Sequence, residues 1–258
     1  MKFYPGFDIQ MSSKPMNFIY GKNVFGPVPE IRCLDDIRSS LANPDCDGPK
    51  DLYCIAMDVG KEEDKKDLIE RNLLYGVVTY AAGQLGTEPI RSQGHIHAIS
   101  ASCNSSTSEV YEIWEGKACI YMQESGEDNP GNCYAVYGKA GDIIIVPPGW
   151  VHATVNADTG NPMTFGAWCV RDYGFDYRAV KDHHGIAYFP KIINGEIHWE
   201  ENRNYSGGKL IVKDARDYPD FHLQKGVSIY EQYRKDQNRF QFVVDPLQDK
   251  ELWNNYRP

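Results

Sequence analysis

The stretch GDIIIVPPGWVHATVN, residues 141–156, decides how the rest of this chain folds. Near its start, residues 143–146 are four β-branched apolar residues, which predict a buried strand. Pro147, Pro148 and Gly149 follow and predict a tight turn, because proline fixes the backbone and glycine tolerates a positive φ. The chain therefore returns as a second strand, and we expect that strand to carry His152 with its imidazole facing the interior.

A second histidine-rich segment, GHIH at residues 94–97, lies upstream. Side chains alternate along an extended chain, so His95 and His97 point to the same face. Neutral imidazole is a common ligand for iron, manganese, zinc and nickel. Together with Glu109 and His152, these residues form a set of three histidines and one carboxylate. Such a set leaves coordination positions open on a metal that takes five or six ligands. It therefore predicts a catalytic rather than a structural metal site.

From residue 73 the sequence consists of short apolar segments separated by closely spaced turn signals. This pattern is typical of an all-β sandwich or barrel. Eight strands in about a hundred residues fit a jelly-roll barrel, whose interior holds one small ligand. The predicted strands are 73–81, 90–97, 110–114, 117–123, 134–137, 143–146, 152–156 and 163–170.

The flanking segments lack this pattern. Residues 1–72 predict an arm rich in proline and glycine, with a short amphipathic helix from Ile31 to Leu41. Residues 73–190 form the predicted barrel, within which the polar stretch 98–108 predicts a loop. Residues 191–258 offer apolar anchors but no continuous helix or sheet pattern, so we expect an extension packed on the barrel.

Composition limits the possible partners. A net charge of −9 over 258 residues makes nucleic acid and anionic membranes improbable partners. No apolar run approaches the roughly 20 residues needed to span a bilayer, and the first residues lack a signal peptide, so we expect a soluble, cytoplasmic protein. The seven cysteines are scattered without a CxxC pair, which argues against disulfides and thiolate zinc sites, and Cys119 and Cys169 fit core positions. Without a dinucleotide fingerprint or Walker loop, we expect no organic cofactor.

The spacing within 141–156 is that of the second motif of the cupin superfamily, with every marked position present. The chain also resembles the first cupin motif, in His95, His97 and Glu109. It departs from that motif in two ways. Pro89 stands where the motif has its leading glycine, and eleven residues separate His97 from Glu109 where cupins usually have three or four.

The long gap leaves two candidates for the carboxylate ligand. Glu112 is the alternative to Glu109, but on a strand the two side chains face opposite sides. Only Glu109 keeps the six-residue spacing to Gly116 that the cupin motif has. We therefore favour Glu109.

The runs YGVVTY, RSQGHIH and SEVYEIWEGKACIYMQ resemble the cupin-type glucose-6-phosphate isomerases, known from archaea and bacteria, over about residues 73–190. The resemblance implies a metal-dependent aldose–ketose isomerase, a sugar phosphate as substrate and a homodimer. It also implies substrate contacts at residues that match the family's positions, namely Thr79, Ser92, Gly94 and Tyr111, and a catalytic role for Tyr177 beside Glu109. Phe175 stands where the family has a histidine, and phenylalanine neither transfers a proton nor holds a sugar hydroxyl.

Two classes of function follow. An isomerase would move the C2 proton of a hexose phosphate to C1, with a metal as Lewis acid and with Glu109, a metal-bound water or Tyr177 as proton carrier. A hydride shift would need no base. The second class is a metal-containing cupin that senses or holds a sugar or sugar phosphate without turning it over, and Phe175 favours it. Oxygen-dependent chemistry at the same iron site is a third possibility.

Overall fold

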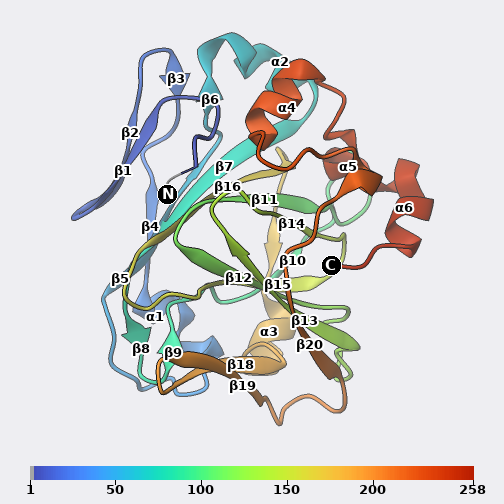
Figure 1. The fold of residues 1–258 in the computed structure, drawn as a ribbon. Helices are drawn as coiled ribbons and strands as arrows, with labels where there is room; N and C mark the ends of the chain where they lie inside the picture. The colour runs from blue at the N-terminus through green and yellow to red at the C-terminus, as the bar shows by residue number, and fades with distance from the viewer. Residues whose placement is uncertain (1–2) are drawn as a thin grey trace.

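Two sheets form the body of the protein, and a computed structural model describes residues 3–258 of it. The six-stranded sheet has the order β14-β11-β16-β7-β5-β4, and the four-stranded sheet has the order β15-β12-β13-β20 (Figure 1). Their strands are β4 (Glu30–Cys33), β5 (Asp51–Met57), β7 (Leu73–Tyr80), β11 (Glu109–Glu115), β12 (Lys117–Gln123), β13 (Asn132–Lys139), β14 (Ile143–Val146), β15 (Val151–Asn156), β16 (Met163–Val170) and β20 (Lys209–Asp214). The predicted jelly-roll barrel is confirmed.

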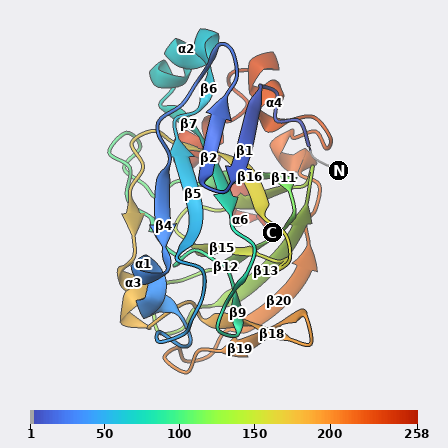
Figure 2. The same cartoon turned by 90° about the vertical axis from the view of Figure 1, so that its left-hand side faces the viewer.

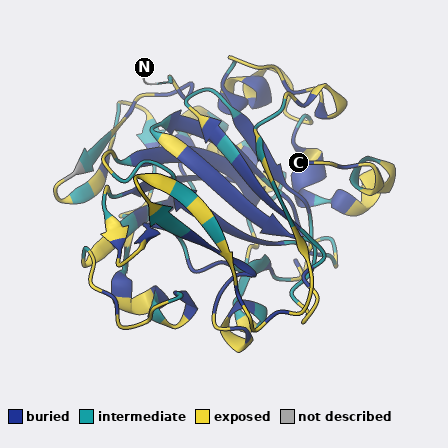
Figure 3. Ribbon diagram, turned by 60° about the horizontal axis from the view of Figure 1, so that its bottom comes forward, coloured by how far each residue is buried: buried dark blue, intermediate teal, exposed yellow. Residues whose placement is uncertain are grey.

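The apolar residues between the two sheets form the barrel's core. That core includes Val78 and Ile113 from the six-stranded sheet and Ile120 and Val136 from the four-stranded sheet. The outer face of the six-stranded sheet is buried as well, under the N-terminal arm and the C-terminal helices. Every residue of β7 and β16 is therefore buried, as the dark blue strands of Figure 3 show. A sheet buried on both faces explains why these strands read as continuous apolar runs.

The N-terminal arm contains the hairpin β1 (Ile9–Ser13) and β2 (Met16–Tyr20), and β3 (Val24–Phe25), which pairs with β6 (Gly60–Lys61). The helix expected from Ile31 begins only at Leu34, as α1 (Leu34–Ile37), because Glu30–Cys33 pairs with β5 instead. Figure 2 shows β4 beside β5 at the edge of the sheet. Two strands from the predicted arm thus extend the barrel sheet.

The C-terminal extension packs on the barrel, and it is more regular than its sequence pattern indicated. It contains the hairpin β18 (Tyr188–Ile193) and β19 (Glu196–Glu201), and β20 pairs in parallel with β13. Its helices are α4 (Ile229–Lys235), α5 (Gln241–Val244) and α6 (Lys250–Asn254). Ser228 caps α4 by accepting a hydrogen bond from the Glu231 amide, which satisfies one free N–H of the first turn.

The remaining elements are short: α2 (Lys65–Glu70), α3 (Arg178–Asp182), β8 (Gln84–Leu85), β9 (Glu88–Pro89), β10 (Ile96–His97) and β17 (Phe175–Asp176). The strand expected over 90–97 is regular only at β10. Before it the chain follows β15 through two isolated bridges, Arg91 to Val155 and His95 to His152. None of the helices within residues 3–258 combines the length and apolarity that a bilayer crossing requires.

Candidate metal centre

The bridge between His95 and His152 builds the site from the backbone. Each residue's amide donates to the other's carbonyl, at 3.0 Å and 2.9 Å, which fixes the two side chains next to each other. Gly94 precedes the bridge with φ +94°, and a Cβ there would lie 2.9 Å from Ile186 Cγ2. Glycine is therefore required where the chain turns into the site.

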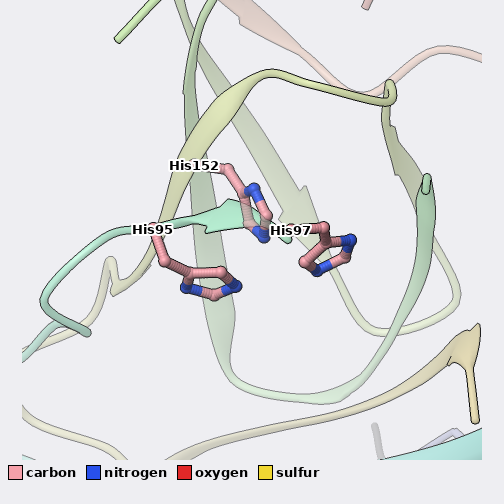
Figure 4. Close-up of side chains that lie close together, drawn as sticks. All are labelled: His95, His97 and His152. Carbon is pink, nitrogen blue, oxygen red and sulfur yellow. The ribbon is translucent and has the colours of Figure 1, made fainter. Parts of the chain in front are cut away.

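The three imidazoles turn toward one another (Figure 4), and one ring nitrogen from each lies within 4.8 Å of the others. The Nδ1 atoms of His97 and His152 lie 3.0 Å from the Thr107 carbonyl and 3.3 Å from the Trp150 carbonyl. These contacts direct Nε2 of both rings into the cluster. The Nε2 atoms of His95 and His152 are buried and make no hydrogen bond of good geometry with any residue in 3–258. A buried nitrogen of this kind fits a metal ion, which accepts its lone pair.

Burial sets the protonation of these rings. Desolvation holds the pKa of His95 well below its usual range, and the neighbouring histidines lower it further. Desolvation also lowers the pKa of His152, although Glu109 opposes the shift. Both rings are therefore neutral near pH 7, and the neutral ring is the form that binds a metal.

Glu109 lies beside the imidazoles at the start of β11. Its Oε2 is 3.3 Å from Nε2 of both His97 and His152, and it accepts a hydrogen bond from the Tyr111 hydroxyl at 2.8 Å. Burial alone would raise the pKa of Glu109, but the contacts with His152 and His97 outweigh burial and lower it. The site thus joins three imidazoles to one carboxylate that stays charged.

Glu112 lies on the opposite face of β11. Its two carboxylate oxygens accept hydrogen bonds from the Ile229 amide at 2.8 Å and from Trp114 Nε1 at 3.2 Å. Desolvation raises the pKa of Glu112 to about 8, although the bond from Ile229 opposes the shift. Glu112 is therefore part of the core beneath α4 and does not line the pocket.

The long loop between His97 and Glu109 is anchored at several points. The Ser106 hydroxyl donates to the His97 carbonyl at 2.8 Å and accepts from the Gly149 amide at 2.9 Å. Nearer the start of the loop, the Ser100 hydroxyl and the Ser102 amide donate hydrogen bonds to the Asp172 carboxylate. The insertion thus connects both histidine segments and presents the Thr107 carbonyl to His97.

A pocket opens from the imidazoles toward the barrel mouth, with about 750 Å³ of empty space including that mouth. Of the residues expected to contact substrate, Ser92, Gly94, Tyr111 and Tyr177 line it. Thr79 does not, and this corrects the expectation. Its hydroxyl lies 2.8 Å from that of Thr164, because Thr79 faces the side of β7 opposite to the pocket residues Val78 and Tyr80.

Aromatic residues form one wall of the pocket. The ring of Phe175 lies 4.4 Å from the ring of His95, centroid to centroid, and Tyr177 lies 5.8 Å from it. Desolvation raises the pKa of Tyr177, and the charge of Arg32 only partly offsets this. Tyr177 is therefore protonated near pH 7 and acts as a hydrogen-bond donor.

Sequence reasoning missed several residues that line the pocket, among them Arg32, Tyr53, Tyr80, Gln93 and Thr154. Gln93 and Thr154 were open to prediction, because each lies within two residues of a predicted ligand. The amide nitrogen of Gln93 is buried without a hydrogen-bond partner among the described residues, so it is free to donate to a ligand. Arg32 and Tyr53 come from strands far from the motifs, and no local signal marks them. Tyr80 ends the run YGVVTY, next to Thr79, but lies on the other face of that strand.

The sequence matches the family model described as Glucose-6-phosphate isomerase (GPI) over residues 47–207. It is 29% identical to the glucose-6-phosphate isomerase of Thermococcus gammatolerans over 53% of this chain and 67% of that protein. It is 31% identical to the enzyme of Thermococcus onnurineus over 47% of this chain and 57% of that protein. The matched region therefore spans roughly three fifths of these relatives' length.

Among solved structures, the chain is similar to oxalate decarboxylase from Bacillus subtilis, with 19% identity and a TM-score of 0.34 over 47% of this chain and 26% of that one. This superposition is too partial to add to the fold already described. The family match is far more extensive, since it covers more than half of the 258 residues. The chain belongs to the glucose-6-phosphate isomerase family, in its cupin-type form.

Proposed function

We propose that this protein is a metal-dependent aldose–ketose isomerase that interconverts glucose 6-phosphate and fructose 6-phosphate. The observation that carries the proposal is the cluster of three imidazoles beside Glu109, two of them buried and that of His95 partly buried, at the inner end of a pocket that opens to solvent. Membership of the glucose-6-phosphate isomerase family supports this reaction over others that the same ligands allow.

His95, His97, His152 and Glu109 would hold one divalent ion of iron, manganese, zinc or nickel. When bound, this ion supplies a Lewis acid that polarises the carbonyl and hydroxyl oxygens at C1 and C2 of the sugar. The protein contributes the position of these ligands. Its backbone bridge at His95 and the carbonyls of Thr107 and Trp150 hold the rings before substrate arrives.

We assign the transfer of the C2 proton to Glu109. Its carboxylate is charged, lies in the pocket and is oriented by the Tyr111 hydroxyl. Because its pKa is lowered, Glu109 is a weak base. It therefore removes the C2 proton of the substrate only when that proton has become more acidic. Tyr177, which is protonated near pH 7, donates to a sugar oxygen. A hydride shift would leave Glu109 without this role, and the exchange of the C2 proton with solvent distinguishes the two routes.

The substrate's other oxygens would be bound by polar groups lining the same pocket. We propose Ser92, Gly94 and Tyr111 as contacts, joined by the buried amide nitrogen of Gln93, which has no partner among residues 3–258. A few convergent polar groups in a pocket mainly fix the orientation of the bound sugar, and they add less to its affinity.

One observation favours a second candidate function. Phe175 places an apolar ring 4.4 Å from His95, where the resembling enzymes have a group that carries protons. A protein with this change would bind a sugar phosphate at its metal and report on it without turnover. Phe175→His tests this candidate, because a binding protein lacking only this group would gain activity, whereas an isomerase that works through Glu109 would change little.

The experiment measures metal content and turnover in the same samples. Protein prepared without chelator should contain about one equivalent of transition metal, and His152→Ala should contain none. Metal-loaded protein should convert fructose 6-phosphate to glucose 6-phosphate in a coupled assay, and in deuterated water the product should carry solvent deuterium at C2. Binding of the phosphosugar with neither exchange nor product over hours would replace the isomerase with the sensor.

The family resemblance also leads us to propose a homodimer. β4 and β20 are each one of the two edge strands of a barrel sheet, and Ile31 on β4 is exposed. Sedimentation velocity over a tenfold range of concentration should give the mass of two chains. A mass near 29.3 kDa at every concentration would show a monomer.

A further inference from the structure

A hexose phosphate brings a dianion into the pocket, and the charges that line the pocket decide where that dianion lies. Among the described residues of the pocket wall, the single permanently positive side chain is that of Arg32 on β4. The one carboxylate in that wall, Glu109, is at the imidazole cluster. On a chain with a net charge of −9, Arg32 therefore supplies the one fixed positive charge among the described residues of this wall.

The position of Arg32 follows from sheet pairing. Arg32 lies opposite Tyr53 in the ladder between β4 and β5, and Tyr53 stacks on Tyr80 with centroids 4.6 Å apart and the ring planes 17° from parallel. All three side chains line the pocket. Phenol rings packed in this way form a rigid base beside the guanidinium.

Two pocket tyrosines respond to the charge of Arg32. Desolvation raises the pKa of Tyr53 and of Tyr177, and in both cases the positive charge of Arg32 partly offsets the shift. Tyr177 also lies 5.8 Å from His95, ring centre to ring centre. Arg32, Tyr53 and Tyr177 all line this pocket, so the guanidinium faces the same space as the wall beside the candidate metal centre.

The present partner of Arg32 is easily exchanged. Its guanidinium lies 3.1 Å from the carboxylate of Glu30, two residues before it on the same strand, and the two side chains are 39% and 68% exposed. Ion pairs at this level of exposure contribute little stability. A phosphate dianion offers a guanidinium two parallel hydrogen bonds and twice the charge, so it competes well against Glu30.

We propose that Arg32 binds the phosphate group of the substrate, leaving the sugar's C1 and C2 at the imidazole cluster. This inference rests on the proposed function and adds the residue that selects phosphorylated over free sugars. Arg32 lies outside residues 47–207, so the family match does not include it. It also takes the place in substrate binding that was expected of Thr79, which faces away from the pocket.

The test compares Arg32→Met and Arg32→Lys with the wild-type protein. We expect Arg32→Met to raise the KM for fructose 6-phosphate about 10- to 100-fold, and kcat to change less than about 3-fold, because the lost contact is remote from the reacting carbons. Arg32→Lys should recover part of the affinity, since the charge remains but the paired hydrogen bonds do not. Titration calorimetry with fructose 6-phosphate should show the same order of affinities.

Arg178→Met is the matched control. Arg178 is also an arginine paired with an acid two residues before it, Asp176, but it is 86% exposed and lies outside the pocket wall. Its replacement should leave KM within about 2-fold of the wild type. Equal effects of Arg178→Met and Arg32→Met would mean that general surface charge, not a phosphate contact, sets the affinity.

The outcomes separate this inference from the proposed function. If the wild type isomerises and Arg32→Met has an unchanged KM, the phosphate contact is wrong while the isomerase stands. If the wild type does not isomerise but binds fructose 6-phosphate, and Arg32→Met weakens that binding at least 10-fold, Arg32 is the phosphate contact of a binding protein. If the wild type neither turns over nor binds the phosphosugar, both proposals fall.

Discussion

Two glutamates on one strand, Glu109 and Glu112, show how differently the two faces of β11 are used. Glu112 is fully buried, the Glu109 side chain is only 14% exposed, and three positions separate them. Glu109 faces the pocket, where contacts with His152 and His97 lower its pKa against the effect of burial. Glu112 faces the C-terminal helices, where desolvation raises its pKa to about 8. Residue type and burial are thus poor guides to role, and the neighbouring groups decide which carboxylate stays charged.

The neighbours of the two glutamates differ in the same way. On the pocket face, Nε2 of His95 and the side-chain amide nitrogen of Gln93 are buried without a hydrogen-bond partner among the described residues. On the outer face, Trp168 packs against Tyr75, Tyr230 and other rings at centroid distances near 5 Å, and its indole nitrogen donates to the Ile229 carbonyl. The Tyr75 hydroxyl is a buried atom without a hydrogen-bond partner within residues 3–258, but aromatic packing dominates this face. Unpartnered polar groups cost stability, and packed aromatic rings provide it. We therefore expect the pocket face to govern activity and the outer face to govern folding.

The largest expected effect is that of Glu109→Gln on turnover. Removing the charge weakens the metal site and deletes the proton carrier, so kcat/KM should fall by about 10³-fold or more. Metal content and activity are measured together on each preparation. Glu112→Gln, assayed at a temperature where it remains folded, is the control and should keep its metal and most of its activity. Loss of metal and activity in Glu112→Gln but not in Glu109→Gln would show that Glu112, not Glu109, faces the pocket.

The next effect is on folding. Trp168→Ala removes a fully buried ring from the aromatic cluster beneath α4, and the free energy of unfolding should fall by about 3–5 kcal/mol. Urea denaturation followed by circular dichroism measures this change. The metal bound per folded molecule should stay at the wild-type value, and its loss would mean that the two faces of the sheet are coupled.

Glu112 should also make stability depend on pH. Its pKa is about 8 in the folded protein and near 4.5 in an unfolded chain, so between these values the folded state holds a proton that the unfolded state releases. Its contribution to stability is therefore complete below about pH 4.5 and is lost as pH rises through 8. As the pH rises from 5 to 9, the free energy of unfolding of Glu112→Gln should increase by roughly 2–4 kcal/mol relative to that of the wild type. If the unfolding free energies of the two proteins changed in parallel over this pH range, Glu112 would not be the group with the raised pKa.

The smallest effect concerns the inserted loop. Ser106→Ala removes one hydrogen bond to the His97 carbonyl and one from the Gly149 amide, so unfolding should become about 1–2 kcal/mol easier. Metal affinity should fall by about 10-fold, because the backbone that orients His97 loosens. Competition with a chelator measures the affinity. Ser102→Ala, in the same loop but bonded to Asn72 and Ser100 and to neither histidine segment, should leave it unchanged.

The sequence alone predicted the barrel and the positions of the histidines, because both depend on local patterns. The turn at Pro147 and Gly149, the His-x-His spacing and the face of β11 follow from strand geometry over a few residues. Thr79 was expected in the pocket because it matches a position of the resembling family, but it faces the other side of β7. That strand is buried on both sides, so its composition does not indicate which side chains point inward. Arg32 was not predicted because its place depends on the pairing of β4 with β5, a contact that no short motif encodes.

The central claim is that a metal held by three histidines and Glu109 catalyses sugar-phosphate isomerisation. The most direct test follows the conversion of fructose 6-phosphate while chelated, metal-free protein is titrated with iron, manganese, zinc or nickel. The account predicts no activity without metal and a linear gain that ends at one equivalent per chain. Full activity in protein shown by elemental analysis to be free of metal would contradict it.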